Sequence, residues 1–214
     1  MLMVTTVNLI EHVIKSKEKD ELSIIHNSDY NLAIWERNPD ERIIELTDSI
    51  LEFLSTAFEA TGTPEYCITE LENKFFGSFS RSFTPLIDDI KMISNWFSEL
   101  SGSKKINIFL GLIDNDMCKI FHTDINDLRL TTTYKGIGTV WTKNSNINRK
   151  TKVPEDCLLD PNDMKFVPPF HVAIMKGALH DKAGAGAIFH RSPSIKESGE
   201  FRLLLRIDTT NSFF

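Results

Sequence analysis

The chain has 214 residues and a formal net charge of −6 at pH 7. A chain of this length can bury a substantial core, and 41% hydrophobic with 25% charged residues is ordinary for a globular protein. The acidic balance gives no reason to expect nucleic acid or an anionic membrane as a partner. No apolar run approaches roughly 18 residues, so the sequence predicts no membrane span.

Two features bear on the cellular compartment. Residues 1–10 lean apolar but lack a basic segment, so they do not resemble a secretory signal. Three cysteines without paired spacing argue against a disulfide framework and favour a reducing environment; they are Cys67, Cys118 and Cys157. We therefore expect a cytoplasmic protein.

Hydrophobic periodicity predicts that residues 1–102 are mainly helical. A short apolar run, residues 31–35, could instead form a strand. Asn38-Pro39 is a typical start for a helix, which we expect to run to about residue 60. The other predicted helices cover residues 9–21, 64–75 and 84–100. Their apolar stripes carry no ionisable group, so we expect these helices to serve packing.

From residue 103 onwards the pattern changes to short β-rich segments separated by turn residues. The predicted strands cover residues 106–113, 117–124, 128–134, 139–141, 170–175, 185–190 and 201–208. About seven short strands of this kind indicate a sandwich or a jelly-roll barrel. Residues 143–169 are polar and contain several prolines, and a loop of this length is typical of a lid or a binding loop.

The sequence thus predicts an α+β protein. An N-terminal helical region, residues 1–102, is expected to pack on a cupin-like, jelly-roll barrel formed by residues 103–214. We find no internal repeat and no low-complexity tract, and we expect the two regions to form one compact unit.

Candidate metal ligands lie on the predicted strand 117–124. Successive side chains of a strand point to opposite faces, so His122 and Asp124 project to the same side. His190 ends a later predicted strand, whose small residues allow a close approach to a neighbour. Two imidazoles and one carboxylate form the set that holds non-haem Fe(II) with open coordination positions. The alternative is a buried hydrogen-bond network that only stabilises the barrel.

Cys118 shares the predicted face of His122 and Asp124. If its thiolate joined the candidate ligands, the set would suit a closed tetrahedral zinc site. Alternatively, Cys118 is a small buried hydrophobic side chain, which is the commoner situation for a free cysteine. The sequence leaves both interpretations open.

The last predicted strand carries arginines on an otherwise apolar stretch. Arg202 and Arg206 share one face of this strand, and the opposite face is apolar. Arg202 suits bidentate capture of a ligand carboxylate, with Arg206 as the competing candidate. A pair between Arg202 and an acidic residue such as Asp208 or Glu200 is the alternative. Arg191 is expected in a turn or against the substrate.

The order of these residues resembles that of the Fe(II)/2-oxoglutarate dioxygenases, whose fold is a double-stranded β-helix. In that superfamily a His-x-Asp pair, a distal histidine and a later basic residue follow one another. The resemblance implies that His122, Asp124 and His190 hold iron. It also implies that Arg202 binds the distal carboxylate of 2-oxoglutarate and that Tyr134 contacts this co-substrate.

The chain also resembles an uncharacterised bacterial family known as domain of unknown function 1826. The resemblance covers most of the chain and rests on Asn31–Trp35, Cys118-x-x-x-His122-x-Asp124, Thr133–Trp141, Met175–Gly177, and His190–Pro193 followed by Arg202–Leu205. This family has no established activity, so the oxygenase expectation rests on the superfamily likeness.

We therefore expect an Fe(II)/2-oxoglutarate-dependent oxygenase of the hydroxylase type, acting on an unidentified small-molecule or peptide substrate. One alternative is a zinc-binding, cupin-like protein for metal handling or sensing without redox turnover. The other is a structural barrel without catalysis. Metal content and 2-oxoglutarate binding distinguish the three.

Overall fold

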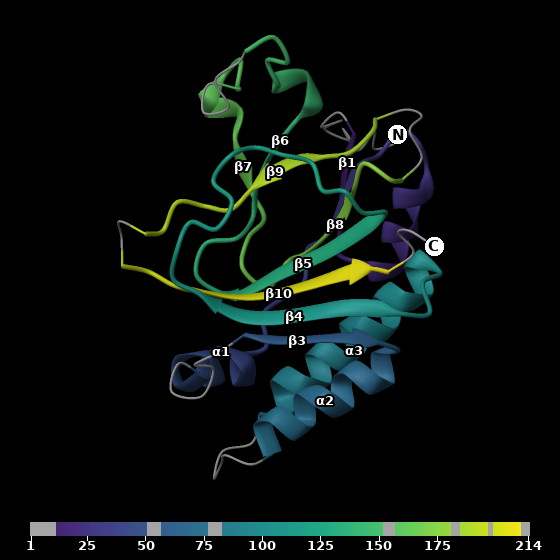
Figure 1. Ribbon diagram of the computed structural model, residues 1–214, viewed down its shortest axis with the longest axis vertical. Helices are drawn as coiled ribbons and strands as arrows, with labels where there is room; N and C mark the ends of the chain where they lie inside the picture. Colours follow the sequence, from purple (N-terminus) through teal and green to yellow (C-terminus); the bar gives the residue numbers. More distant parts are fainter. Residues whose placement is uncertain are drawn as a thin grey trace, which may run out of the picture.

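The computed structural model describes residues 12–50, 57–76, 83–151, 157–180, 185–196 and 199–210. Within them the fold is mixed α/β, with helices on one side of a large sheet and a small sheet on the other side (Figure 1). Among the described helices, none has the length and apolar character needed to cross a membrane.

The large sheet has seven strands in the order β1-β2-β8-β5-β10-β4-β3. Neighbouring strands are antiparallel, except that β1 and β2 run parallel. The strands are β1 (Val13–Ser16), β2 (Leu32–Trp35), β3 (Phe58–Gly62), β4 (Ile106–Ile113), β5 (Leu128–Lys135), β8 (Val172–Lys176) and β10 (Arg202–Thr209). β10 therefore lies inside the sheet, between β5 and β4.

The small sheet has three strands in the order β7-β6-β9. They are β7 (Lys165–Phe166), β6 (Val140–Thr142) and β9 (Phe189–Arg191). Trp141 of β6 lies opposite His190 of β9. Figure 1 shows this sheet on the side of the large sheet that faces away from the helices α2 and α3.

The α-helices are α1 (Glu41–Ser49), α2 (Pro64–Phe76) and α3 (Thr84–Ser101). Asp40 caps α1, because its side chain accepts a hydrogen bond of 2.9 Å from the main-chain N–H of Arg42. α3 ends at Gly102, whose φ of 67° lies in the left-handed region that favours glycine. Short 3₁₀ helices cover Lys19–His26, Asn144–Asn146 and Pro161–Asp163.

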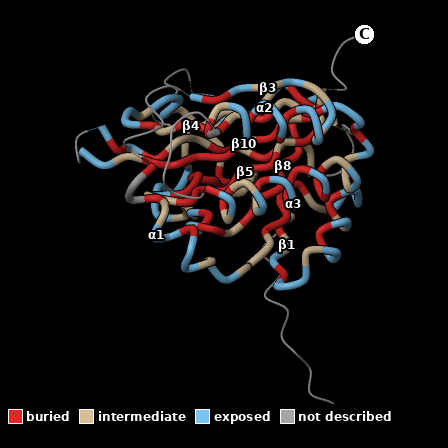
Figure 2. The backbone as a smooth tube through the Cα atoms, turned by 90° about the horizontal axis from the view of Figure 1, so that it is seen from below, coloured by how far each residue is buried: buried red, intermediate tan, exposed pale blue. Residues whose placement is uncertain are grey.

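Apolar side chains fill both sides of the large sheet, and its central strands β8, β5 and β10 run through the buried interior (Figure 2). Alternate residues of β10, namely Leu203, Leu205 and Ile207, join the cluster that also contains the buried faces of α2 and α3. A second cluster includes Trp141 of β6 and Met175 of β8, and so lies between the two sheets. Because side chains alternate along a strand, the intervening residues of β10 face the space between the sheets.

Two predicted helices differ from the observed structure. Residues 58–62 form strand β3 and not the end of a helix, because Phe58 pairs with Leu110 of β4 and its side chain is buried. Residues 13–16 form β1 beside β2. Tertiary pairing has here overridden local helical periodicity. Residues 41–49 are helical as predicted, and residues 9–11 and 51–56 of these two predictions lie outside the described residues.

The region expected to be a helical extension contributes three strands, β1, β2 and β3, to the large sheet. β2 pairs with β8, and β3 pairs with β4. Both halves of the chain therefore build one sheet, and residue 102 does not separate a helical layer from a β layer. The predicted helices over α2 and α3 and the predicted strands over β4, β5 and β10 are confirmed.

Residues 117–124 do not form the expected regular strand. Met117 has a φ of 42°, so the segment leaves the extended conformation at its start. One isolated bridge joins His122 to His190, and each main-chain N–H donates to the carbonyl oxygen of the other at 3.0 Å. This bridge places two candidate ligands side by side.

Candidate metal centre

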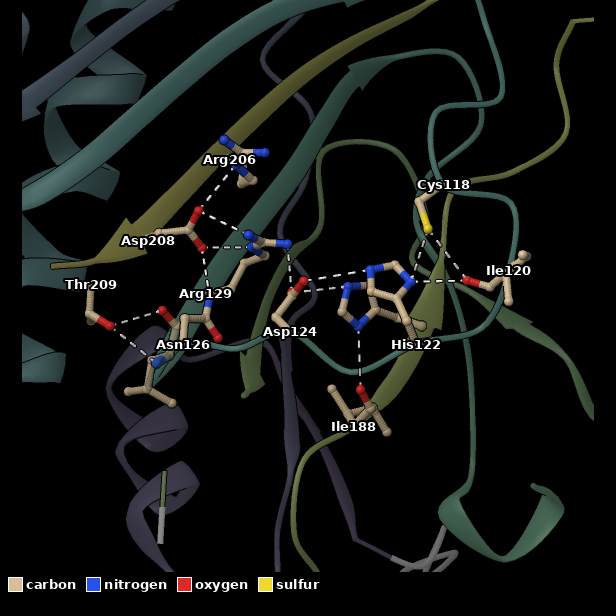
Figure 3. Close-up of polar contacts among 12 residues, drawn as sticks. Cys118, Ile120, His122, Asp124, Asn126, Arg129, Ile188, Arg206, Asp208 and Thr209 are labelled. Carbon is tan, nitrogen blue, oxygen red and sulfur yellow. Dashed lines mark hydrogen bonds and ion pairs between the residues drawn. The ribbon is translucent and has the colours of Figure 1, made fainter. Parts of the chain in front are cut away.

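His122, Asp124 and His190 converge on one point between the sheets. One potential ligand atom from each lies within 4.8 Å of the other two. Asp124 Oδ1 is 3.5 Å from His122 Nε2, and Asp124 Oδ2 is 3.1 Å from His190 Nε2. Figure 3 shows His122 and Asp124 pointing toward one another. The structure thus brings together the three residues that the sequence selected.

Main-chain carbonyls fix the tautomer of both imidazoles. His122 Nδ1 lies 2.9 Å from the oxygen of Ile120, and His190 Nδ1 lies 3.3 Å from the oxygen of Ile188. A carbonyl oxygen only accepts, so Nδ1 carries the hydrogen in both rings. Nε2, which faces Asp124, is left as the nitrogen able to bind a metal. Hydrogen bonding of the second ring nitrogen is typical of metal-binding histidines.

Asp124 is ionised in this setting. Burial opposes its charged form, but hydrogen bonds from His122 and His190 and the charge of Arg129 outweigh burial and lower the pKa of the carboxyl well below its usual range. The hydrogen bond to Asp124 likewise raises the pKa of His122 against the opposing effect of burial. The carboxylate therefore favours a positive partner, either a proton on the imidazole or a metal ion.

The three side chains fit a metal ion. Asp124 Oδ2 is buried and makes no well-aligned hydrogen bond within the described residues, although the Arg129 guanidinium and the His190 imidazole lie close to it. Ligand atoms about 2.1 Å from one ion and at right angles are about 3.0 Å apart, close to the observed 3.1 and 3.5 Å. Two imidazoles and one carboxylate are also the donor set of non-haem Fe(II) sites.

Cys118 does not join this group of donor atoms. Its Sγ lies 3.4 Å from Nδ1 of His122, on the side of the ring away from Asp124 (Figure 3). The residue is exposed and not buried. The grouped donor atoms in the described part of the chain come from His122, Asp124 and His190. The geometry therefore does not form the four-ligand set considered for zinc.

Arg129 of β5 is a part of the site that the sequence interpretation missed. Its NH1 lies 2.5 Å from Asp124 Oδ2, and its Nε and NH2 lie 2.6 and 3.0 Å from the carboxylate of Asp208 (Figure 3). Asp208 also pairs with Arg206 Nε at 3.1 Å. The available signal was the strand alternation, which places Arg129 on the same face of β5 as Thr131 and Thr133.

Arg202 is buried with 1% exposure and lacks an acidic partner among the described residues. Its NH2 donates to Thr133 Oγ1 at 3.2 Å, and its Nε has no hydrogen-bond partner in the described part of the chain. Burial lowers the pKa of Arg202 to about 10, so the guanidinium remains charged at neutral pH. The alternative pair with Asp208 is not formed, because Asp208 binds Arg129 and Arg206.

One cavity of about 300 Å³ connects the three candidate metal ligands with Arg202. Its lining combines the three candidate ligands with four arginines, small polar side chains and the exposed pair Met117 and Cys118. Thr131 Oγ1 belongs to this lining and is buried without a hydrogen-bond partner. The cavity therefore contains unsatisfied donors at one end and a metal-ligand group beside them.

Tyr134 does not reach the cavity. It lies on the face of β5 opposite to Thr133, where its hydroxyl donates to Asp89 Oδ2 of α3 at 2.7 Å. Arg37 binds the same carboxylate, and the ring is buried among the helices. The expected contact between Tyr134 and a co-substrate is thus inconsistent with its position. Arg206 and Arg191, the two further candidates, both line the cavity.

The sequence matches, over residues 16–208, the model of a family described as protein of unknown function (DUF1826). The chain belongs to this family. No curated protein matches the chain. The DUF1826 membership gives a relationship without an activity.

Solved structures with a similar fold include dioxygenases. The dioxygenase for auxin oxidation 1 from Arabidopsis thaliana, in its binary complex with 2-oxoglutarate, has a TM-score of 0.59 at 8% identity, covering 94% of this chain and 92% of that chain. A full-length Neurospora crassa protein, solved in complex with alpha-KG, has a TM-score of 0.46 at 10% identity, covering 92% and 83%. At 8% identity, the likeness to the Arabidopsis protein concerns the fold alone.

Proposed function

We propose that this DUF1826 protein is a non-haem Fe(II)- and 2-oxoglutarate-dependent oxygenase of the hydroxylase type. The observation that carries the proposal is a single cavity lined by both the His/Asp/His group and Arg202. Arg202 is buried and has no carboxylate partner among the described residues. When bound, iron and 2-oxoglutarate would supply the activation of O₂ for oxidation of a substrate. The fold shared with a dioxygenase that binds 2-oxoglutarate adds support.

The proposal includes the architecture. The large and small sheets would form the two walls of a double-stranded β-helix, the jelly-roll and cupin-like barrel expected from the sequence. Two features support this arrangement: an apolar cluster shared by both sheets, and the main-chain bridge between His122 and His190. The cavity lies between these walls, where the inward residues of β10 and β9 meet.

In this function His122, Asp124 and His190 would hold the metal ion. The hydrogen bonds from each Nδ1–H to a main-chain carbonyl keep Nε2 directed at the ion. Arg129 holds the Asp124 carboxylate from its other side. Because the protein already orients these three groups, little rearrangement would accompany metal binding.

Arg202 would anchor the distal carboxylate of 2-oxoglutarate. A buried donor without an acceptor costs about 1–3 kcal/mol, and Arg202 Nε is such a donor. Thr131 Oγ1, also unpartnered, offers a second donor in the same cavity. A ligand carboxylate can accept hydrogen bonds from both Arg202 and Thr131 and neutralise the guanidinium. No carboxylate among the described residues neutralises it.

Metal analysis and 2-oxoglutarate binding on the same protein test the proposal. Wild type should bind one Fe(II) and, with metal present, 2-oxoglutarate. His122→Ala should lose the metal because Nε2 is a ligand, and Arg202→Gln should retain the metal but bind 2-oxoglutarate at least about tenfold more weakly. His26→Ala, an exposed histidine outside the cavity, is the matched control.

Metal retained by His122→Ala, or 2-oxoglutarate bound equally well by Arg202→Gln, would contradict the assignment. Cys118→Ser separates the iron proposal from the zinc alternative. We expect this variant to keep its metal, since Sγ lies beside Nδ1 and away from Nε2. Weakened retention of zinc in Cys118→Ser would instead favour a metal-handling protein.

A further inference from the structure

Arg191 of β9 lines the cavity but has no task in the proposed function. Its guanidinium donates to the main-chain oxygen of Ser192 at 3.0 Å and to Met164 Sδ at 3.7 Å. It also lies 5.3 Å from the centre of the Phe121 ring. All three of these partners are uncharged, although one of them is a π system that favours a cation.

The donors of Arg191 are only partly used. A guanidinium has five N–H groups in a fixed fork, and two hydrogen bonds, one to a weak sulfur acceptor, leave several of them free. In the described part of the chain Arg191 forms no ion pair. Asp116 attracts it from a distance, but Asp116 Oδ1 already accepts the main-chain N–H groups of Ile195 and Lys196 at 2.8 and 2.9 Å.

The cavity carries more positive charge than the proposed metal and co-substrate use. Its lining contains four arginines and Asp124, and Asp208 pairs with two of the arginines. Glu59 lies 4.0 Å from Arg206 and offsets one further charge, so adding a divalent ion and the two carboxylates of 2-oxoglutarate still leaves one positive charge. The chain as a whole has a net charge of −6, so this excess is a local feature. It favours an additional anion.

We propose that Arg191 binds an oxyanion, a carboxylate or a phosphate, carried by the substrate. The substrate is then a small acid, and its apolar part contacts Phe121 and Met164 beside the guanidinium and the exposed Met117 of the cavity lining. Arg191 and the three candidate ligands line the same cavity, so an acid held by Arg191 lies within reach of the metal group. The assignment of this anion to a substrate rests on the proposed function. The existence of the anion site does not depend on it.

Binding of simple aryl acids tests the site by calorimetry without any turnover. The probes are benzoate and phenyl phosphate, with benzamide as the uncharged analogue of benzoate. Metal-free wild type, Arg191→Gln and Arg191→Lys are compared after circular dichroism has shown that each is folded. Arg149→Gln is the matched control, because Arg149 also lies over a ring, 5.6 Å from the centre of Phe189, but is exposed and outside the cavity lining.

We expect at least one of the two anions to bind wild type and benzamide not to bind. Arg191→Gln should weaken the anion about tenfold or more, Arg191→Lys should give an intermediate affinity, and Arg149→Gln should match wild type. The stronger of the two anions identifies the oxyanion class. Equal affinity in Arg191→Gln, equal binding of benzamide, or no binding of either anion would overturn the inference.

An Arg202→Gln arm separates this site from the co-substrate site. If Arg191 binds the probe, the affinity persists in Arg202→Gln and is lost in Arg191→Gln. The reverse pattern would place the anion at Arg202 and overturn the inference while leaving the oxygenase proposal intact. Anion binding that depends on Arg191 in a protein that fails to bind iron would leave the anion site standing and remove the oxygenase proposal.

Discussion

At the scale of single residues, Asp124 is the side chain on which the site depends. Its Oδ1 faces His122 and its Oδ2 faces both His190 and Arg129, and it remains ionised despite its burial. Arg129 in turn is held by a bidentate pair with Asp208. The carboxylate that would bind the metal is therefore positioned by a chain of charged groups that begins on β10.

Replacement of Arg129 by Gln should weaken metal affinity by roughly 10- to 100-fold, the range for residues that orient a metal ligand. Removal of a positive charge would by itself favour the ion, but Asp208 already neutralises Arg129, so the loss of orientation should dominate. Affinity is measured by competition with a chelator. Arg206→Gln is the control, because Arg206 forms an ion pair with Asp208 but not with Asp124. An unchanged or tighter metal complex in Arg129→Gln would refute the positioning role.

At the scale of elements, a glycine turn supports the segment that carries Asp124. Gly177 follows β8, and the main-chain N–H groups of Gly177, Ala178 and Leu179 donate to the carbonyls of Asp127, Asp124 and Asn126 at 2.9, 2.7 and 3.0 Å. A Cβ at Gly177 would collide with the main chain and side chain of Asn126. The turn and the ligand segment therefore pack together only because Gly177 has no side chain.

Gly177→Ala should destabilise the fold by about 1–3 kcal/mol through this overlap and should also weaken metal binding, since it displaces the Asp124 segment. Thermal unfolding and metal titration are measured together. Gly199→Ala is the control: its φ of 68° carries a backbone cost, but its Cβ would meet no atom within 4 Å. Equal losses of stability in both variants with unchanged metal affinity in Gly177→Ala would show that the turn does not position Asp124.

Elements with a strong local pattern could be predicted from the sequence. α3 has a stripe of buried residues and a glycine end, and β10 alternates between arginine-bearing and apolar faces. β3 could not be predicted, because its strand conformation comes from pairing with β4 far along the chain. The conformation of residues 117–124 could not be predicted from local pattern either. His122 and Asp124 meet through the main-chain bridge to His190 and not through strand alternation.

Chain order alone selected His122, Asp124, His190 and Arg202 as candidates, and the structure places all four on one cavity. Arg129 was missed because its importance arises from partners on other segments, Asp124 and Asp208. Tyr134 was selected by its place in the order, but alternation puts it on the opposite face from Thr133, toward Asp89. Selecting a site residue requires both its order along the chain and the face of the sheet on which its side chain lies. Only the folded sheet determines that face.

At the scale of the whole molecule, the metal-free protein should show a stability that depends on His122. Its folded-state pKa is raised by Asp124, so the protonated imidazole stabilises the fold fully below its unfolded pKa of about 6.5. This contribution is lost as the pH rises through the raised value. Asp124, with a lowered pKa, contributes above about pH 3.9 and does not change over this interval.

The difference in unfolding temperature between metal-free wild type and His122→Gln should therefore be larger near about pH 6 than near about pH 9. Calorimetry of the two proteins at both pH values, with chelator present, measures it. A difference that is constant or grows with pH would contradict the pairing of protonated His122 with Asp124. Bound iron should remove the stabilisation by the proton in wild type, because it replaces the proton on Nε2.

The reciprocal hydrogen bonds between His122 and His190 have a consequence for how this centre can change over time. They are made by main-chain atoms, which every residue other than proline possesses. These two hydrogen bonds therefore do not depend on the side chains at positions 122 and 190. A related chain with another residue in place of either imidazole would have a different set of candidate ligands but could keep the same main-chain junction.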